Sequence, residues 1–177
     1  MAATAAMCVA MATTGCGGGQ QPSPRVQVWD EDTVEVASLS SDKVVVPFTP
    51  KDGGCMEIQV SLNGEPFNML WDTGASITSI SALELQRLDK AGKITLDDLQ
   101  GTIVAQIADG SYTEEYVFNL AEILIPARDN QSLTLHDIEA CVSANTSAPL
   151  LVGQNIMREL PRHTVDNAEN VIIFERQ

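Results

Sequence analysis

The chain has 177 residues, of which 24 are acidic and 10 are basic, so its formal net charge at pH 7 is −14. This length is enough for one domain with a hydrophobic core and an additional tail. The acidic excess leaves no basic patch for phosphate groups, so no nucleic acid is expected as a partner. No apolar run approaches the roughly 20 residues that a membrane-spanning helix needs.

The first 14 residues carry no charge and are rich in Ala, Met and Thr. An uncharged stretch that ends in small residues is typical of a secretory signal peptide. Thr14-Gly15-Cys16 also resembles the end of a bacterial lipobox, in which the cysteine is lipidated after cleavage before it. We therefore predict a signal peptide in residues 1–15, lipidation of Cys16 and location in the bacterial cell envelope, lipid-anchored or periplasmic. Contact with a membrane is then expected through the lipid anchor only. The alternative is an unstructured terminus without a targeting role.

Residues 16–42 are rich in Pro, Ser and acidic side chains, and strand character is confined to Val26–Trp29. This composition predicts a flexible tether, followed by a folded domain in residues 43–177. Without Cys8 and with lipid on Cys16, two thiols remain, Cys55 and Cys141. They either form a disulfide in an oxidising compartment or are ordinary small core residues. No Cys/His spacing indicates zinc, and neither a metal nor a cofactor is expected.

The first half of the domain reads as strands joined by a tight turn. Val44–Phe48 is a β-branched run in which Pro47 indicates an edge or a strand end. Met56–Leu62 alternates apolar and polar residues with period two, as a half-buried strand does. Asn63-Gly64 then predicts a two-residue hairpin turn, followed by a buried strand at Phe67–Trp71.

The second half continues with short strands and two short helices. Ser81–Glu84 has the spacing of a capping box, which predicts a helix that ends near Gly92. Asp109-Gly110 predicts a second tight hairpin between strands at Thr102–Ile107 and Tyr112–Leu120. Further strands are predicted at Ile77–Ile80, Ala121–Ile125, Ile138–Val142, Pro149–Gly153 and Val171–Phe174, and a second helix at Gln154–Leu160. These elements predict a mostly β fold, a barrel or a sandwich.

The candidate chemistry lies in Asp72-Thr73-Gly74-Ala75-Ser76, which follows the apolar Phe67–Trp71 strand. A carboxylate there is costly to bury unless it is hydrogen-bonded or shares a proton with a second acid. Two facing carboxylates that share a proton can activate a water molecule. The alternative for so short a motif is an aspartate that caps a loop between two core strands.

The order of these elements resembles the retropepsin-like aspartic proteases, specifically their single-domain bacterial members, over roughly Val44 to Phe174. Four segments carry the resemblance: the hairpin Met56–Trp71, the loop at Asp72, the flap-like Ala108–Ser111, and the strand and helix of Leu150–Met157. The resemblance implies a retropepsin-like acid-protease barrel with one or two short helices. It also implies an aspartic endopeptidase that acts on polypeptides through an Asp-activated water.

The resemblance assigns roles to single residues. Asp72 is the expected catalytic acid, with Thr73, Gly74 and Ala75 in the active-site loop and Asp109 and Gly110 in the flap. The hydroxyl of Thr73 is expected to bridge two such loops, Gly74 to let substrate backbone approach, and Gly153 to leave room behind the loop. Since the chain has one Asp-Thr-Gly, a homodimer is expected, with Val171–Phe174 in its interface. The alternative function is a non-catalytic peptide-binding envelope module on the same fold.

Both histidines, His136 and His163, are predicted to be solvated loop residues. Neither belongs to an HExxH motif, and no GxSxG nucleophile elbow is present. The sequence therefore favours carboxylate chemistry at Asp72 over zinc or serine hydrolysis. Trp71 is bulkier than the small or branched residue expected directly before the catalytic aspartate.

Overall fold

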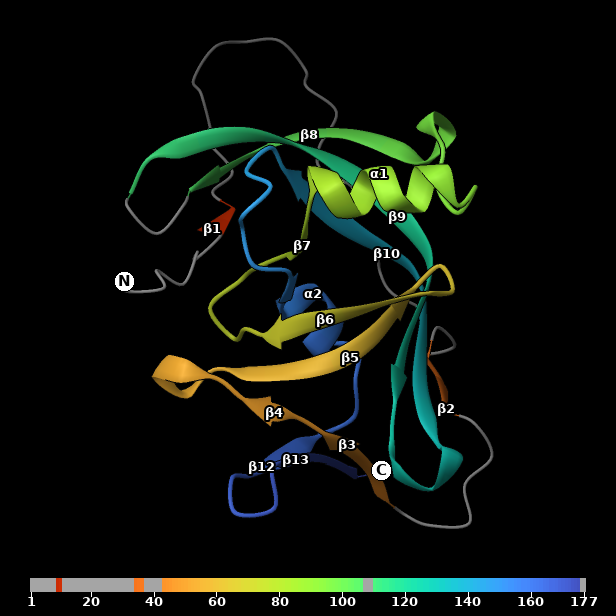
Figure 1. The fold of residues 1–177 in the computed structure, drawn as a ribbon, viewed down its shortest axis with the longest axis vertical. Helices are drawn as coiled ribbons and strands as arrows, with labels where there is room; N and C mark the ends of the chain where they lie inside the picture. The colour runs from red at the N-terminus through yellow and green to blue at the C-terminus, as the bar shows by residue number, and fades with distance from the viewer. Residues whose placement is uncertain (1–8, 11–33, 37–42, 107–109, 176–177) are drawn as a thin grey trace, which may run out of the picture.

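The computed structural model describes residues 9–10, 34–36, 43–106 and 110–175, which form two β-sheets and short helices (Figure 1). The larger sheet has the strand order β1-β8-β9-β10-β7-β11-β6-β5-β4, with β2 paired to β10. The smaller sheet has the order β12-β13-β3. The strands are β1 (Val9–Ala10), β2 (Val34–Val36), β3 (Lys43–Pro47), β4 (Thr49–Pro50), β5 (Met56–Leu62), β6 (Glu65–Trp71), β7 (Thr78–Ser81), β8 (Leu99–Gln106), β9 (Tyr112–Pro126), β10 (Ser132–Ser143), β11 (Leu151–Val152), β12 (His163–Asp166) and β13 (Val171–Glu175). The helices are α1 (Ala82–Lys90) and α2 (Gln154–Met157), with 3₁₀ turns η2 (Asp52–Gly54), η3 (Leu96–Asp98) and η4 (Arg128–Asn130).

The larger sheet closes on itself because β9 pairs with β5 as well as with β8 and β10. Ser61 and Leu62 of β5 lie opposite Leu124 and Ile123 of β9. The closed ring of β5, β6, β11, β7, β10 and β9 surrounds a core of aliphatic side chains, among them Leu62, Leu120, Ile123, Ile125 and Leu133, which are fully buried. The prediction of a mostly β barrel with two short helices is confirmed.

Local sequence signals explain two of the connections. Asn63 and Gly64 both have positive φ angles, 49° and 87°, as the two-residue turn between β5 and β6 requires. Ser81 caps α1: its side chain accepts a hydrogen bond from the backbone of Leu83, and Glu84 bonds back to the backbone of Ser81. Both predicted motifs are confirmed, including the capping box.

Several predicted boundaries are wrong in the region after the second hairpin. Tyr112–Leu120 and Ala121–Ile125 are not two strands but one, β9, because β8, β10 and β5 each pair with part of its length. His136 lies in β10 opposite Glu122, and His163 begins β12, so neither histidine is in a loop. The polar segments around His136 and His163 are strands because β9 and β13 supply the partners for their backbone hydrogen bonds.

The expectation of an unpaired strand edge at Val171–Phe174 is wrong, and a role of this segment in a dimer interface stays a prediction. This segment is β13, and it pairs with β12 along one edge and with β3 along the other. Both rows of its backbone groups are therefore occupied within the chain, and no edge is left for a partner strand.

The remaining predictions about the N-terminal region concern residues that lie largely outside the described ranges. Cys16 and Val26–Trp29 belong to that part, whereas β1 and β2 fall inside the predicted signal peptide and tether. Cys55 precedes β5 and Cys141 lies in β10, and the two do not form a disulfide with each other. In the described ranges, no helix has the length and hydrophobicity to cross a bilayer.

Candidate active site

The loop that begins at Asp72 is held against β11 by backbone hydrogen bonds. Asp72 N–H donates to the carbonyl of Val152 at 3.1 Å, and Leu70 N–H donates to Leu150 at 2.8 Å. The parallel pairing of β6 with β11 therefore continues to the first residue of the motif. This fixes the position at which Asp72 leaves the sheet.

The carboxylate of Asp72 is half-buried and is oriented by its own loop. Its Oδ1 accepts a hydrogen bond of 2.8 Å from Gly74 N–H, and Ala75 N–H donates to the Asp72 carbonyl at 3.2 Å. Within the described part of the chain, Oδ2 accepts no hydrogen bond. The hydrogen bond fixes the orientation of one carboxylate oxygen, while the other oxygen is available for a water molecule or a second acid.

Gln154, the first residue of α2, clamps the same loop from the other side. Its backbone N–H donates to the carbonyl of Ala75 at 2.8 Å, and its side-chain Nε2 donates to the carbonyl of Thr73 at 2.9 Å. Ala75 is fully buried, whereas Thr73 and Ser76 are exposed. The loop is thus anchored from within and turns its hydroxyl-bearing residues outward.

Gly153 packs directly against the backbone beside the loop. A Cβ atom at this position would lie 2.4 Å from the carbonyl carbon of Ile77 and 2.7 Å from Thr78 N. Backbone atoms cannot move aside as a flexible side chain can, so this site accepts glycine alone. The geometry agrees with the expectation that Gly153 leaves room behind the active-site loop.

Asn155 supports the site, although no role was predicted for it from the sequence. Its Oδ1 accepts hydrogen bonds from Thr78 N–H at 2.8 Å and from Thr78 Oγ1 at 2.9 Å, and its Nδ2 donates to the Glu139 carbonyl at 2.7 Å. Thr78 Oγ1 also accepts from Gly153 N–H at 3.2 Å. The network joins α2 to β7 and β10. The signal that could have revealed it is a pair of polar residues, Gln154-Asn155, inside an otherwise apolar segment.

The hairpin of β8 and β9 lies over the loop that follows β6, as Figure 1 shows at the left of the molecule. The described ladder ends at the pair Gln106–Tyr112. Asp109 lies outside the described residues, while Gly110 is exposed and has a φ angle of 86°. The carbonyl of Gly110 accepts a hydrogen bond of 3.2 Å from Gln106 Nε2. Of the two flap residues predicted, the structure thus describes only the glycine, in a turn conformation.

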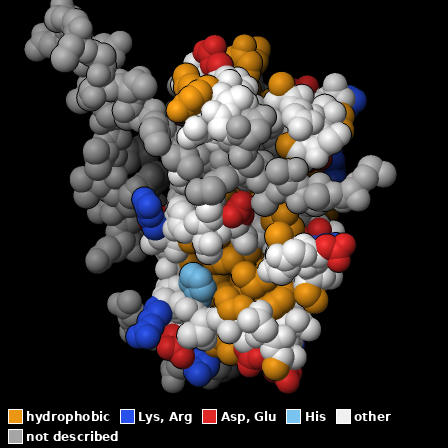
Figure 2. Space-filling view, turned by 90° about the vertical axis from the view of Figure 1, so that its left-hand side faces the viewer, with side chains coloured by type: hydrophobic (Ala, Val, Ile, Leu, Met, Phe, Trp, Pro, Cys, Tyr) orange, Lys and Arg blue, Asp and Glu red, His pale blue; other side chains and the backbone are white. Residues whose placement is uncertain are grey.

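The bulk of Trp71 has a structural reason. Trp71 is buried, and its ring lies 5.4 Å from that of His163 and 6.0 Å from that of Phe174. The aromatic group connects β6 to the smaller sheet. Figure 2 shows the side of the molecule that is on the left in Figure 1. Hydrophobic side chains lie at the surface of its lower half, beside a histidine and flanked by charged groups.

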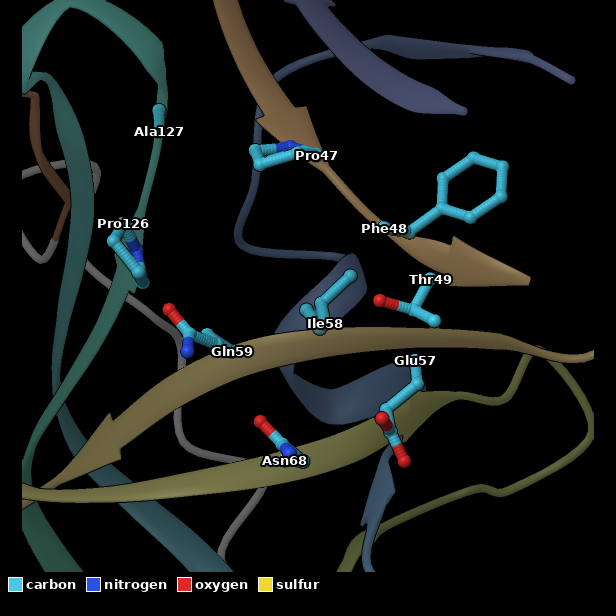
Figure 3. A pocket seen from close by; sticks show the side chains of 9 residues that line it. All are labelled: Pro47, Phe48, Thr49, Glu57, Ile58, Gln59, Asn68, Pro126 and Ala127. Atoms are coloured by element: carbon cyan, nitrogen blue, oxygen red, sulfur yellow. The ribbon is translucent and has the colours of Figure 1, made fainter. Parts of the chain in front are cut away.

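A separate hollow of about 370 Å³ lies beside β5 and is also lined by residues of β3, β4, β6 and β9 (Figure 3). Gln59 and Pro126 face one another across it from β5 and β9. The register that pairs Ser61 with Leu124 would place Pro126 opposite Gln59, but proline has no N–H for the ladder. The two strands therefore separate there. Asp72 does not line this hollow.

Among the described residues, no group of three or more His, Cys, Asp or Glu side chains is placed to hold a metal ion. The chemistry that the loop itself offers is that of a carboxylate with one hydrogen-bonded oxygen, on a rigid turn, beneath a β-hairpin. This combination of closed barrel, Asp-Thr-Gly loop and overlying hairpin defines the class of retropepsin-like aspartic proteases.

Comparison with known proteins supports this class. Residues 58–159 match the model of the family described as gag-polyprotein putative aspartyl protease, and the chain belongs to this family. Among solved structures, it is similar to a retropepsin-like aspartic protease from Rickettsia conorii, at 15% sequence identity and a TM-score of 0.53. The match covers 81% of this chain and 94% of the Rickettsia chain, and at this identity it shows a shared fold. No curated protein matches the sequence significantly.

Proposed function

We propose that the chain is an aspartic endopeptidase that works as a homodimer, with one catalytic Asp72 from each subunit. The observation that carries the proposal is the half-buried carboxylate of Asp72, hydrogen-bonded at one oxygen and held on a loop anchored by Val152 and Gln154. The sequence has a single Asp-Thr-Gly, so a second carboxylate of the same kind must come from a second copy.

In the proposed mechanism, the two Asp72 carboxylates share one proton across the two-fold axis. One takes a proton from a water molecule as the water attacks the peptide carbonyl, and the other donates its proton to the carbonyl oxygen. Thr73 is exposed, and we expect its hydroxyl to contact the partner's loop. The substrate class is a polypeptide in an extended form, bound between the loop and the β8–β9 hairpin.

Cleavage of an unstructured protein at acid pH tests this function, with and without an aspartic-protease inhibitor such as pepstatin. We expect Asp72→Asn to abolish cleavage, because an amide can neither take up nor release the required proton. Asp89→Asn, at an exposed position of α1, serves as the matched control and is expected to retain full activity. Cleavage that survives in purified Asp72→Asn would refute the assignment.

The binding-module alternative makes a different prediction for the same proteins. A wild-type chain that binds the polypeptide but never cleaves it, at any pH between about 3 and 7, would support that alternative.

A further inference from the structure

Glu115 is a buried acidic residue that the proposed mechanism does not use. Its side chain lies on β9 with a residue exposure of 3%, and among the described residues its Oε2 has no hydrogen-bond partner. The salt bridges described in the structure involve other acids, namely Glu57, Glu65 and Glu175. A buried carboxylate without a counter-charge is unfavourable, so a cationic partner would stabilise it.

The two faces of the β8–β9 hairpin are defined by their residues: Glu115 lies on the face called inner, and Val104, Glu114 and Tyr116 lie on the face called outer. Side chains on the outer face are strongly exposed, with 55% for Val104, 61% for Tyr112 and 58% for Tyr116. Glu114 belongs to this outer face, is exposed and accepts a hydrogen bond of 2.9 Å from Thr102 Oγ1. Because successive residues of a strand point to opposite faces, Glu115 is turned the other way, as is the buried Ala105 of β8.

The strand registers place this inner face on the same side of the sheet as Asp72. Cross-strand partners lead from β6 to β9 in one row, and such partners share a face. The row consists of Leu70, Leu151, Ser79, Cys141 and Val117. Asp72 lies two residues after Leu70, and Glu115 lies two residues before Val117, so both belong to this face.

The opposite face of the same strands is occupied by a helix. Phe118, which alternates with Val117 along β9, lines a hollow together with Ala82 and Leu85 of α1. The face that carries Glu115 is therefore the one without α1. Figure 1 shows the β8–β9 hairpin on the side of the barrel from which the loop after β6 emerges.

We propose that Glu115 is a specificity-determining residue of the substrate cleft and that its carboxylate receives a Lys or Arg side chain of the bound polypeptide. The inference rests on the proposed function. A cation is the kind of side chain that neutralises an unpaired buried carboxylate, and its aliphatic stem can pack on Ile103, the half-buried residue opposite Glu115. The chain's net charge of −14 also attracts cationic peptides.

The test uses a set of peptides derived from one cleaved sequence, in which each position near the scissile bond carries either Lys or the uncharged norleucine. At one position, the wild type is expected to prefer Lys, with a ratio of kcat/KM of about tenfold or more. Glu115→Gln keeps the shape but removes the charge, and should reduce this ratio to about one. Glu114→Gln, one residue away on the outer face, is the matched control and should keep the ratio.

Circular dichroism and thermal unfolding establish that each variant is folded, and Glu115→Met provides a second uncharged variant. The inference is overturned if the wild type prefers norleucine at every position, or if the Lys preference persists in folded Glu115→Gln. If the wild type cleaves no peptide, the proposed function fails separately. The preference is then measured as the ratio of the Kd values for the norleucine and Lys peptides by fluorescence anisotropy. A preference for norleucine in the wild type, or a Lys preference that persists in Glu115→Gln, overturns the inference there too.

Discussion

The ring of His163 meets the ring of Trp71 edge-on, with 5.4 Å between the ring centroids and an interplanar angle of 89°. Trp71 ends β6 directly before Asp72, and His163 begins β12 of the smaller sheet. Phe174 of β13 lies 5.2 Å from His163 and completes the group. The smaller sheet thus packs against β6, the strand that ends directly before the proposed catalytic residue. We therefore expect the stability of the smaller sheet to depend on this contact with the larger sheet.

Replacement of His163 tests this connection. We expect His163→Ala to lower the free energy of unfolding by about 1 kcal/mol, because the edge-to-face contact and part of the apolar burial are lost. Urea denaturation measures the change. Thr164→Ala, at an exposed position of the same strand, should change the value by no more than about 0.5 kcal/mol. Equal effects of the two changes would contradict a specific role of the ring.

Gly153→Ala is expected to be severely destabilising. The new Cβ would lie 2.4 Å from the backbone of Ile77, and relief of that clash requires the backbone of Ile77 and Thr78 to move. We expect a loss of about 3 kcal/mol in the free energy of unfolding, or a failure to fold. Gly92→Ala is the control, since its Cβ would meet nothing within 4 Å and only its φ of 67° is strained. That strain alone should lower the free energy of unfolding by about 1 kcal/mol. An equal loss in Gly153→Ala and Gly92→Ala would refute the clash.

Asn155→Ala removes three hydrogen bonds and leaves Thr78 N–H and the Glu139 carbonyl without their side-chain partner. Since Thr78 is fully buried, we expect a loss of about 2 kcal/mol in unfolding free energy. A double-mutant cycle with Thr78→Val measures the coupling, which should be non-zero. Asn167→Ala, at an exposed position, provides the baseline. Strict additivity of the two site changes would argue against the network.

Dimerisation is expected to strengthen with salt and at acidic pH. Each chain carries a net charge of −14, so two copies repel one another, and both screening and carboxylate protonation reduce that repulsion. Analytical ultracentrifugation should show the monomer–dimer equilibrium move towards the dimer under both conditions. Proteolytic activity should rise faster than linearly with concentration near the dimer dissociation constant. A fully active monomer would refute the two-subunit site.

We also propose, from the sequence of residues 1–16, that the mature chain begins at a lipidated Cys16 and resides in the bacterial cell envelope. Each buried CH₂ group contributes about 0.8 kcal/mol, so several acyl chains would give a lasting anchor. Mass spectrometry of the mature N-terminus and membrane fractionation check this, with Cys16→Ser as the variant that should lose the anchor. An unmodified Met1, or soluble protein cleaved elsewhere, would contradict it.

Much of the barrel was predictable because its signals are local. The alternation of Met56–Leu62, the Asn63-Gly64 turn and the capping box at Ser81 each depend on residues close in sequence. The roles of β9 and β13 were not predictable in this way. A single 15-residue strand at Tyr112–Pro126 is possible only because three other strands share its length.

By itself, the sequence determined the position of Asp72, at the end of an apolar strand and in a motif with a known class of chemistry. The tertiary structure alone decided what holds and surrounds that carboxylate. Gln154 lies 81 positions after Thr73, and Asn155 lies 77 positions after Thr78. These residues meet only when β11 and α2 pack beside β6 and β7. The same holds for Glu115, whose place on the same face as Asp72 follows from the registers of five strands. Such contacts have no local signature, because they arise from pairing between segments whose order in space is set by closure of the whole barrel.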